Sequence, residues 1–296
     1  MFFLHKKKRY AILFLHIENL ILLQQNMKKS LLILFTLVLS LNSNAQNEYG
    51  KITYNKAVNI SGKQRMLGQK MSKAYLYLLE NPDNSLVKKE LRQAELLFEK
   101  HHKILMENAP SAKISKELKD VDHFWHRFKK IFDEAPNRHD AKKIIHKNSE
   151  LLKNSDEVVK AIVANHDSQI EEPENNDLTL KSTIDISGRQ RMLSQRLALY
   201  YFANANKLKD KETNKILRES FSLFDHTISR LSVSRFNKEK IKIAINKAMK
   251  NWEVLKNQKT KILRHKMDVK EVYERTNKLT QSFNEITALY ERVRIN

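Results

Sequence analysis

Two arginines stand at the centre of a ten-residue segment that the chain contains twice. Arg65 lies in Ser-Gly-Lys-Gln-Arg-Met-Leu-Gly-Gln-Lys (61–70), and Arg191 lies in Ser-Gly-Arg-Gln-Arg-Met-Leu-Ser-Gln-Arg (187–196). A guanidinium group is planar, forked and permanently charged, so it suits flat oxyanions such as nitrate or a carboxylate. The serines would add hydroxyl donors, and the glycines would let a ligand approach the backbone. Six candidate ligand-binding residues follow: Ser61, Gly62, Arg65, Ser187, Gly188 and Arg191.

A structural role for the two arginines is the alternative. Charged side chains are seldom fully buried, so Arg65 and Arg191 could simply face solvent. They could also pair with a nearby carboxylate that fixes the register of two packed helices. The residue types and their spacing leave the binding role and the structural role open.

The repeat extends well beyond the arginine segments. Residues of the same type recur at an offset that grows slowly from 126 to 128, as two copies of one domain with small loop insertions would produce. The chain therefore contains two tandem homologous units. The corresponding pairs are Ser61 and Ser187, Phe98 and Phe224, Trp125 and Trp252, and Leu151 and Leu279.

The composition predicts an all-α fold of two tandem up-down four-helix bundles. The chain has only four glycines and four prolines, and its apolar residues recur at helical spacing. Prolines and capping residues divide each unit into four helices. We expect bundle 1 at 46–170, a charged linker at 171–177 and bundle 2 at 178–296. The expected helices are 49–80, 85–108, 115–134 and 137–170, then 178–207, 211–231, 237–265 and 268–295.

The N-terminal region predicts export. A basic pair, an apolar run and a short segment ending in Ala45 make residues 27–45 typical of a secretory signal peptide. Met27 is then the expected start, and residues 1–26 are upstream sequence read as protein. An uncleaved membrane anchor is the alternative, but the apolar run is short for a membrane helix. We expect a soluble, exported, periplasmic protein that begins at Gln46.

Several function classes lack the residues that they need. Without cysteine the chain can form no disulfide and has no thiolate chemistry. No nucleophile–base pair, glycine-rich phosphate loop or carboxylate dyad stands out, so we expect neither an enzyme nor a cofactor. Glu99 and His102 have the Glu-x-x-His spacing of di-iron bundles, but a second such motif is missing. We therefore expect no metal site.

The net charge of +21 would suit a polyanionic partner. However, the lysines are spread over all the expected helices and are not grouped with stacking aromatic residues. Export also argues against a nucleic-acid partner. We interpret the charge as a solvated basic surface.

The repeated segment resembles the signature of the PilJ-type domain, the N-terminal sensory domain of type IV pilus methyl-accepting chemotaxis transducers. It is also similar to the P-box of nitrate/nitrite sensor histidine kinases, and both families have four-helix periplasmic domains. The resemblance implies that one arginine from the first helix of each subunit grips a single nitrate at a dimer interface. On this chain those arginines correspond to Arg65 and Arg191, and the second basic position of the box falls on Lys70 and Arg196. The resemblance thus adds Lys70 and Arg196 to the candidate ligand-binding residues.

Topology allows this interface to form within one chain. An up-down-up-down bundle begins and ends at the same pole, so a short linker can start the second bundle beside the first. We expect an intrachain pseudo-dimer in which Arg65 and Arg191 face each other across one anion. If the bundles stacked end to end, each arginine would serve a separate contact.

The sequence thus indicates an exported sensory or binding protein for a small nitrate- or nitrite-like oxyanion. A separate membrane receptor or an envelope or pilus protein would be its output partner. The alternative function is a ligand-free helical interaction module of an envelope, type IV pilus or chemosensory assembly.

Overall fold

The structure is a computed structural model that describes residues 48–167, 179–208 and 211–293. The described residues from Tyr49 onward form one compact unit. The predicted upstream sequence (1–26), signal peptide (27–45) and linker (171–177) lie outside the described residues.

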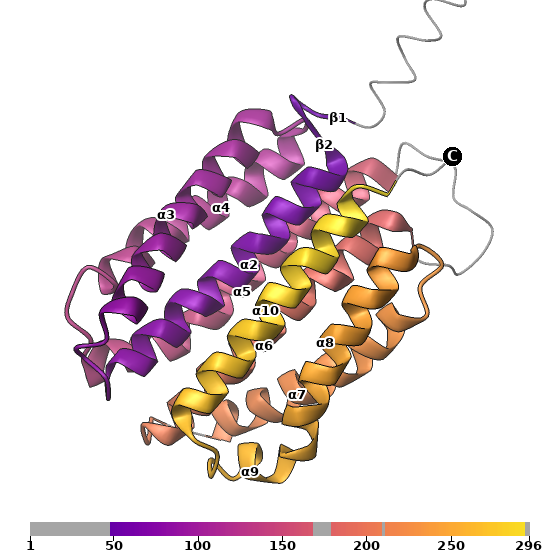
Figure 1. Cartoon of the computed structure of the whole chain (residues 1–296). Coiled ribbons are helices and arrows are strands. Elements are labelled where there is room, and N and C mark those ends of the chain that lie inside the picture. The colour runs from indigo at the N-terminus through magenta and orange to yellow at the C-terminus, as the bar shows by residue number, and fades with distance from the viewer. Residues whose placement is uncertain (1–47, 168–178, 209–210, 294–296) are drawn as a thin grey trace, which may run out of the picture. The chain divides into compact units, whose positions relative to one another are not determined.

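The first copy of the repeat forms a four-helix bundle. Its first helix packs against the second and the fourth, and the third packs against the fourth (Figure 1). A short 3₁₀ turn, η1 (Lys129–Ile131), extends the third helix. The helices are α2 (Tyr54–Leu78), α3 (Ser85–Asn108), α4 (Ala112–Phe128) and α5 (Arg138–Asp167).

The second copy repeats this arrangement. Its first helix packs against its second and its last, and the last packs against the third. The all-α fold of two tandem four-helix bundles is therefore confirmed. None of the described helices has the length and apolarity that crossing a membrane requires. The helices are α6 (Leu180–Ala205), α7 (Lys211–Ser232), α8 (Glu239–Asn257), the short α9 (Lys259–Leu263) and α10 (Val269–Glu291).

Several helix bounds differ from the prediction. The expected helix 115–134 is observed as α4 (Ala112–Phe128) followed by η1, and two further differences occur elsewhere. The first helix does not begin at residue 49, because β1 (Glu48–Tyr49) pairs with β2 (Ile52–Thr53) through a turn at Gly50. Gly50 has a φ of 59°, which favours glycine, and a Cβ there would lie 2.7 Å from the Asn108 carbonyl oxygen. The expected helix 237–265 is interrupted at Gln258, where α8 ends and α9 begins.

Side-chain caps explain where several helices begin. Asn84 accepts from the Val87 amide at 3.1 Å, and Thr179 accepts from the Ser182 amide at 3.2 Å. At the last helix, Asp268 accepts from the amide of Glu271 at 2.8 Å. These bonds satisfy backbone donors that the first turn of a helix leaves free.

The same buried aromatic pair anchors both bundles. Ring centroids lie 4.4 Å apart in the first bundle and 4.2 Å apart in the second. In each bundle the indole N–H donates to a carboxylate on the second helix, and a lysine bonds the same carboxylate. The two repeats are therefore equivalent in side-chain detail at this anchor. The groups are Phe98, Trp125, Glu99 and Lys129, and their equivalents Phe224, Trp252, Asp225 and Lys256.

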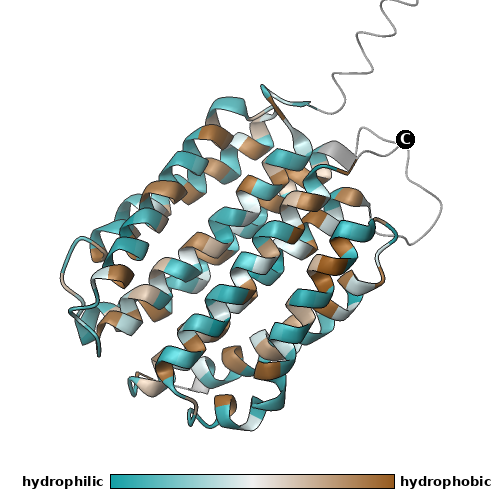
Figure 2. Cartoon of the chain, in the orientation of Figure 1, coloured by the Kyte–Doolittle hydropathy of each residue, from teal (hydrophilic) through white to brown (hydrophobic). Residues whose placement is uncertain are grey.

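The most extensive contact between helices joins α2 to α6, the first helices of the two bundles. Further contacts join α2 to α10 and α5 to α6, so the bundles lie side by side along these helices. Each first helix thus packs against its own bundle and against the other. Almost every residue of α2 is consequently buried, although Figure 2 shows hydrophilic as well as hydrophobic segments along it.

A buried lysine lies at this contact. The Nζ atom of Lys73 (α2) donates to Asn277 Oδ1 at 2.6 Å and lies 3.9 Å from the ring centroid of Tyr273, both on α10. The Tyr273 hydroxyl donates to Glu90 on α3, which also forms an ion pair with Lys70. Burial lowers the pKa of Lys73 to about 7, although the Glu90 carboxylate opposes this effect.

This environment predicts a pH-dependent stability. An unfolded lysine keeps its proton up to about pH 10.4, whereas folded Lys73 releases it near pH 7, so stability rises between these values. The contribution is at most about 1.4 kcal/mol per pH unit. Urea unfolding at pH 7.5 and pH 9 should show this rise, and Lys73→Leu, which copies Leu199 of the second repeat, should remove it. The exposed Lys103→Met variant is the control, and equal pH slopes in all three proteins would contradict the prediction.

Candidate functional site

Arg65 is buried in the contact between the bundles and is bound by two carboxylates. Its Nη1 atom donates to Asp156 Oδ1 of α5 at 2.7 Å, and its Nη2 atom donates to Asp185 Oδ1 of α6. Burial disfavours the charge, but Asp185 and Asp156 outweigh burial and raise the pKa of Arg65. Two carboxylates of the protein thus bind this guanidinium through its terminal nitrogens, whereas its Nε atom is buried without a hydrogen-bond partner among the described residues.

Arg191 is equally buried but is bound only by neutral oxygens. Its Nη1 atom donates to Asn59 Oδ1 at 2.7 Å and to Asn284 Oδ1 at 3.4 Å. Its Nη2 atom donates to the Asn59 carbonyl at 3.3 Å, and its Nε atom to the Gly188 carbonyl at 3.4 Å. No carboxylate forms an ion pair with Arg191 among the described residues.

The partners of the two arginines occupy equivalent positions in the two repeats, but they are carboxylates around Arg65 and amides around Arg191. Asn59 and Asp185 correspond at the offset of 126, and Asp156 and Asn284 correspond at the offset of 128. Each arginine therefore binds the first helix of the other bundle and the last helix of its own, as two-fold symmetry requires. The first copy of this arrangement holds two carboxylates, and the second holds two amides.

This exchange leaves a positive environment around Arg191. Burial and the neighbouring charge of Arg65 lower the pKa of Arg191. Burial, followed by the charges of Lys63 and Arg191, lowers the pKa of His101 to about 4. The charges of Asp185 and Glu291 oppose the effects of burial and Arg65 on Arg191, although neither carboxylate forms an ion pair with Arg191, and Glu291 accepts instead from Asn59 Nδ2 at 2.5 Å. A guanidinium keeps its proton at neutral pH, so Arg191 is a buried cation without a direct counterion.

The repeated glycines provide room for the arginines. A Cβ on Gly188 would lie 2.8 Å from Arg191 Nη2. A Cβ on Gly62 would lie 3.1 Å from Arg191 Nη2 and 3.5 Å from Arg65 Nη2. Both guanidinium groups therefore approach Gly62, and the structure brings together four of the predicted residues: Gly62, Arg65, Gly188 and Arg191.

The two serines are bonded elsewhere. Ser61 Oγ donates to the Val58 carbonyl at 3.1 Å, and Ser187 Oγ lies 2.6 Å from Thr287 Oγ1. The second basic positions are also engaged away from the arginine pair. Lys70 pairs with Glu90 at 2.8 Å, and Arg196 lies over the ring of Tyr200 and donates to Gln69 Oε1 at 3.4 Å.

Four residues of this site were not among the predicted ligand-binding residues. They are the polar partners of the arginines, two on the first helices and two on the last. A signal for them was present, because the offset that relates the repeats aligns aspartate with asparagine at both positions. They are Asn59, Asp156, Asp185 and Asn284.

The Glu-x-x-His segment of the first bundle, Glu99 to His102, uses its carboxylate in bonds within the protein. Glu99, the carboxylate of the Glu-x-x-His spacing, accepts from Trp125 at 3.3 Å and from Lys129 at 2.9 Å. Within the part of the chain that the structure describes, no cluster of three or more His, Asp or Glu side chains could hold a metal ion.

The carboxylates around Arg65 predict a structural role for this arginine. Arg65→Met leaves Asp156 and Asp185 partly buried with only the more exposed Lys160 and Arg189 as counterions, so the free energy of unfolding should fall by about 1–3 kcal/mol. Adding Asp156→Asn and Asp185→Asn to Arg65→Met should restore part of this loss. Urea unfolding measures both effects, and a loss below about 0.5 kcal/mol would refute the structural role.

Comparisons with known proteins identify the repeat. The family model described as "Type IV pili methyl-accepting chemotaxis transducer N-term" matches residues 53–151 and 178–269, one segment in each bundle. No curated protein and no solved structure matches the chain. The two matched segments contain the two arginine motifs and cover well over half of the sequence. The chain therefore belongs to the PilJ family and carries its sensory-type domain in two tandem copies.

Proposed function

We propose that this protein senses a small planar oxyanion of the nitrate or nitrite type and binds it at Arg191. The observation that carries the proposal is the exchange of carboxylates for amides between the two copies. Arg65 is neutralised by Asp156 and Asp185, whereas Arg191 is bound by Asn59 and Asn284. Only the second arginine retains a charge that an external anion would compensate.

Electrostatics favours binding at this position. A cation that is removed from water is stabilised strongly by a counterion, because the low dielectric of the interior weakens screening. A planar anion can accept two parallel N–H bonds from one guanidinium. An anion there would also relieve the repulsion between Arg191 and Lys63, which adds to burial in lowering the pKa of Lys63.

This arrangement gives an asymmetric form of the expected site. The sequence led us to expect one anion held equally by Arg65 and Arg191. With Arg65 already bound by carboxylates, we place the anion at Arg191 and assign Arg65 to its immediate surroundings. Lys70 and Arg196 take no part in this proposal.

Binding at Arg191 would affect the contact between the bundles. Asn59 belongs to α2 and Arg191 to α6, so an anion that takes donors from Arg191 competes with a bond that joins the bundles. The population of the α2–α6 arrangement would then depend on the anion. We propose that the protein is exported and that a separate membrane receptor or envelope protein reads this change.

A thermal-shift titration tests the site. The protein from Gln46 onward, which contains the whole compact unit, is titrated with nitrate and nitrite at fixed ionic strength, with chloride and sulfate as controls. Ligand at 100 times its Kd stabilises the folded state by about 2.7 kcal/mol, so the melting temperature should rise by about 5 °C or more. A rise of equal size with chloride would contradict the proposal.

Two variants, in which one copy receives the residues at the equivalent positions of the other copy, make the test specific. Asn284→Asp gives Arg191 the carboxylate that Asp156 gives Arg65, so the protein should remain folded and lose its response to nitrate. The reverse change, Asp156→Asn with Asp185→Asn, removes the carboxylates from Arg65 and should strengthen the nitrate response. An unchanged response in Asn284→Asp would refute binding at Arg191.

The internal pairing of Arg65 supports a second candidate function. A site that is already filled by Asp156 and Asp185 needs no ligand, and such a protein could act as a helical interaction module of an envelope, pilus or chemosensory assembly. The same titration separates the two functions. The module predicts no selective anion response in the wild type and a lower melting temperature in Arg191→Met.

A further inference from the structure

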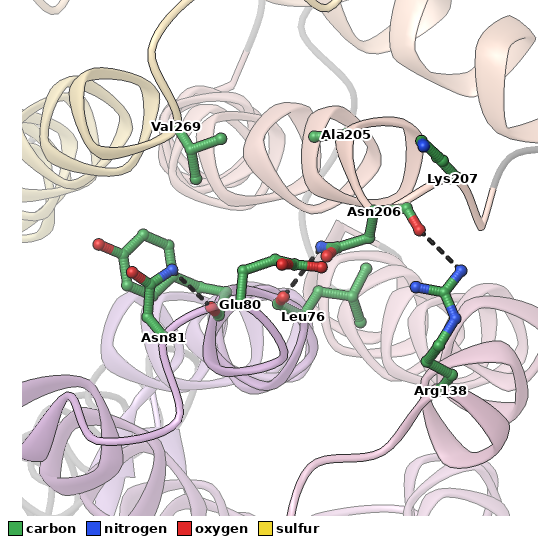
Figure 3. A pocket seen from close by; sticks show the side chains of 9 residues that line it. Leu76, Glu80, Asn81, Arg138, Ala205, Asn206, Lys207 and Val269 are labelled. Atoms are coloured by element: carbon green, nitrogen blue, oxygen red, sulfur yellow. Dashed lines mark hydrogen bonds between the residues drawn. The ribbon is translucent and has the colours of Figure 1, made fainter.

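A cavity lies where the C-terminal ends of α2 and α6 meet, away from the N-terminal ends of these two helices. It has a volume of about 400 Å³ and is lined by the C-terminal ends of α2 and α6 together with the first residues of α5 and α10 (Figure 3). Its size is within the range of pockets for small ligands. The anion proposal uses none of the residues that line it.

Asn206, which lines this cavity, has a side-chain acceptor without a hydrogen-bond partner in the described part of the chain. Its Nδ2 atom donates to the carbonyls of Leu76 at 3.1 Å and Phe202 at 3.0 Å, so the amide orientation is fixed by two acceptors. The residue is 5% exposed, and its Oδ1 atom is buried without a hydrogen-bond partner among the described residues. A buried amide oxygen of this kind is stabilised by a donor, which a ligand can supply.

Glu80 supplies a negative charge at the same place. It occupies the position in the first copy that corresponds to Asn206 in the second, at the offset of 126. Its carboxylate lies between the ends of α2 and α6 in Figure 3, and it forms no ion pair within the described ranges. The C-terminal ends of α2 and α6 add partial negative charge, because the helix dipoles are directed that way. The centre of the cavity therefore favours a cation with N–H donors.

Arg138 supplies the opposite charge at one side. Its Nη2 atom donates to the backbone carbonyl of Asn206 at 3.0 Å, and Figure 3 shows its second terminal nitrogen facing the cavity. Lys207 lies beside it on the same wall. A carboxylate on the ligand could accept from these groups while its ammonium group lies near Glu80.

We infer that this cavity binds a small α-amino acid, whose ammonium group donates to Glu80 and Asn206 Oδ1 and whose carboxylate accepts from Arg138. The ligand places one positive and one negative group against walls of opposite charge. It also gives the buried Asn206 oxygen the donor that it lacks. The site spans both bundles, because Glu80 belongs to the first and Asn206 to the second.

Three matched probes test which group is recognised. L-Alanine carries both charged groups, propylamine carries only the ammonium and propionate only the carboxylate. Calorimetric titration of the protein from Gln46 onward should give saturable binding for L-alanine, at least tenfold weaker binding for propylamine and none for propionate. No saturable binding of L-alanine, or equal binding of propionate, would overturn the inference.

Site variants locate the binding. Glu80→Gln removes the charge of a surface residue with little change of shape, and it should weaken L-alanine binding at least tenfold. Arg138→Gln should weaken L-alanine but leave propylamine unchanged. Glu253→Gln, an exposed carboxylate of α8, is the control and should bind normally. Unchanged binding in Glu80→Gln would overturn the site, and unchanged L-alanine binding in Arg138→Gln would overturn the carboxylate contact.

Nitrate responses should be the same in all three variants, so this test is independent of the Arg191 proposal.

Discussion

The burial of two arginines where α2 meets α6 is the constraint on which the rest of the structure depends. A helix that is packed on all sides cannot place its charges in solvent, so each guanidinium must find its partners within the protein. Glycines at the points of closest approach make room for the arginine side chains. The partners come from the neighbouring first helix and from the last helix of the same bundle. The tandem bundles are thus joined by polar bonds as well as by apolar packing.

Duplication allows the two copies of this arrangement to differ. The copy around Arg65 contains two carboxylates, whereas the copy around Arg191 contains amides at the equivalent positions. The difference between aspartate and asparagine at two positions separates an arginine with two carboxylate partners from one that forms no ion pair among the described residues. The two copies also differ at the C-terminal ends of α2 and α6, where a carboxylate (Glu80) and an amide (Asn206) occupy equivalent positions.

The fold could be predicted from the sequence because its signals are local. Prolines and capping residues mark the helix ends, and the repeated tryptophans occupy the same buried position in both bundles. The partners of the arginines could not be predicted in the same way, because they are brought close only by the packing of distant helices. Arg65 and Asp185 are 120 residues apart, and Arg191 and Asn59 are 132 apart. Equally, nothing in the repeated segment indicates that its serines bond to other groups or that Lys70 pairs with Glu90.

Because α2 and α6 belong to one chain, their contact can become asymmetric during evolution and does not depend on the protein concentration. In a symmetric homodimer every substitution occurs on both sides of the interface, so the Asp-to-Asn exchange could not be confined to one arginine. A single chain removes that restriction. It also makes the pairing of the two halves intramolecular, so it does not weaken as the protein is diluted. The contact between the bundles is therefore the same in each molecule, whether the cell makes few copies or many.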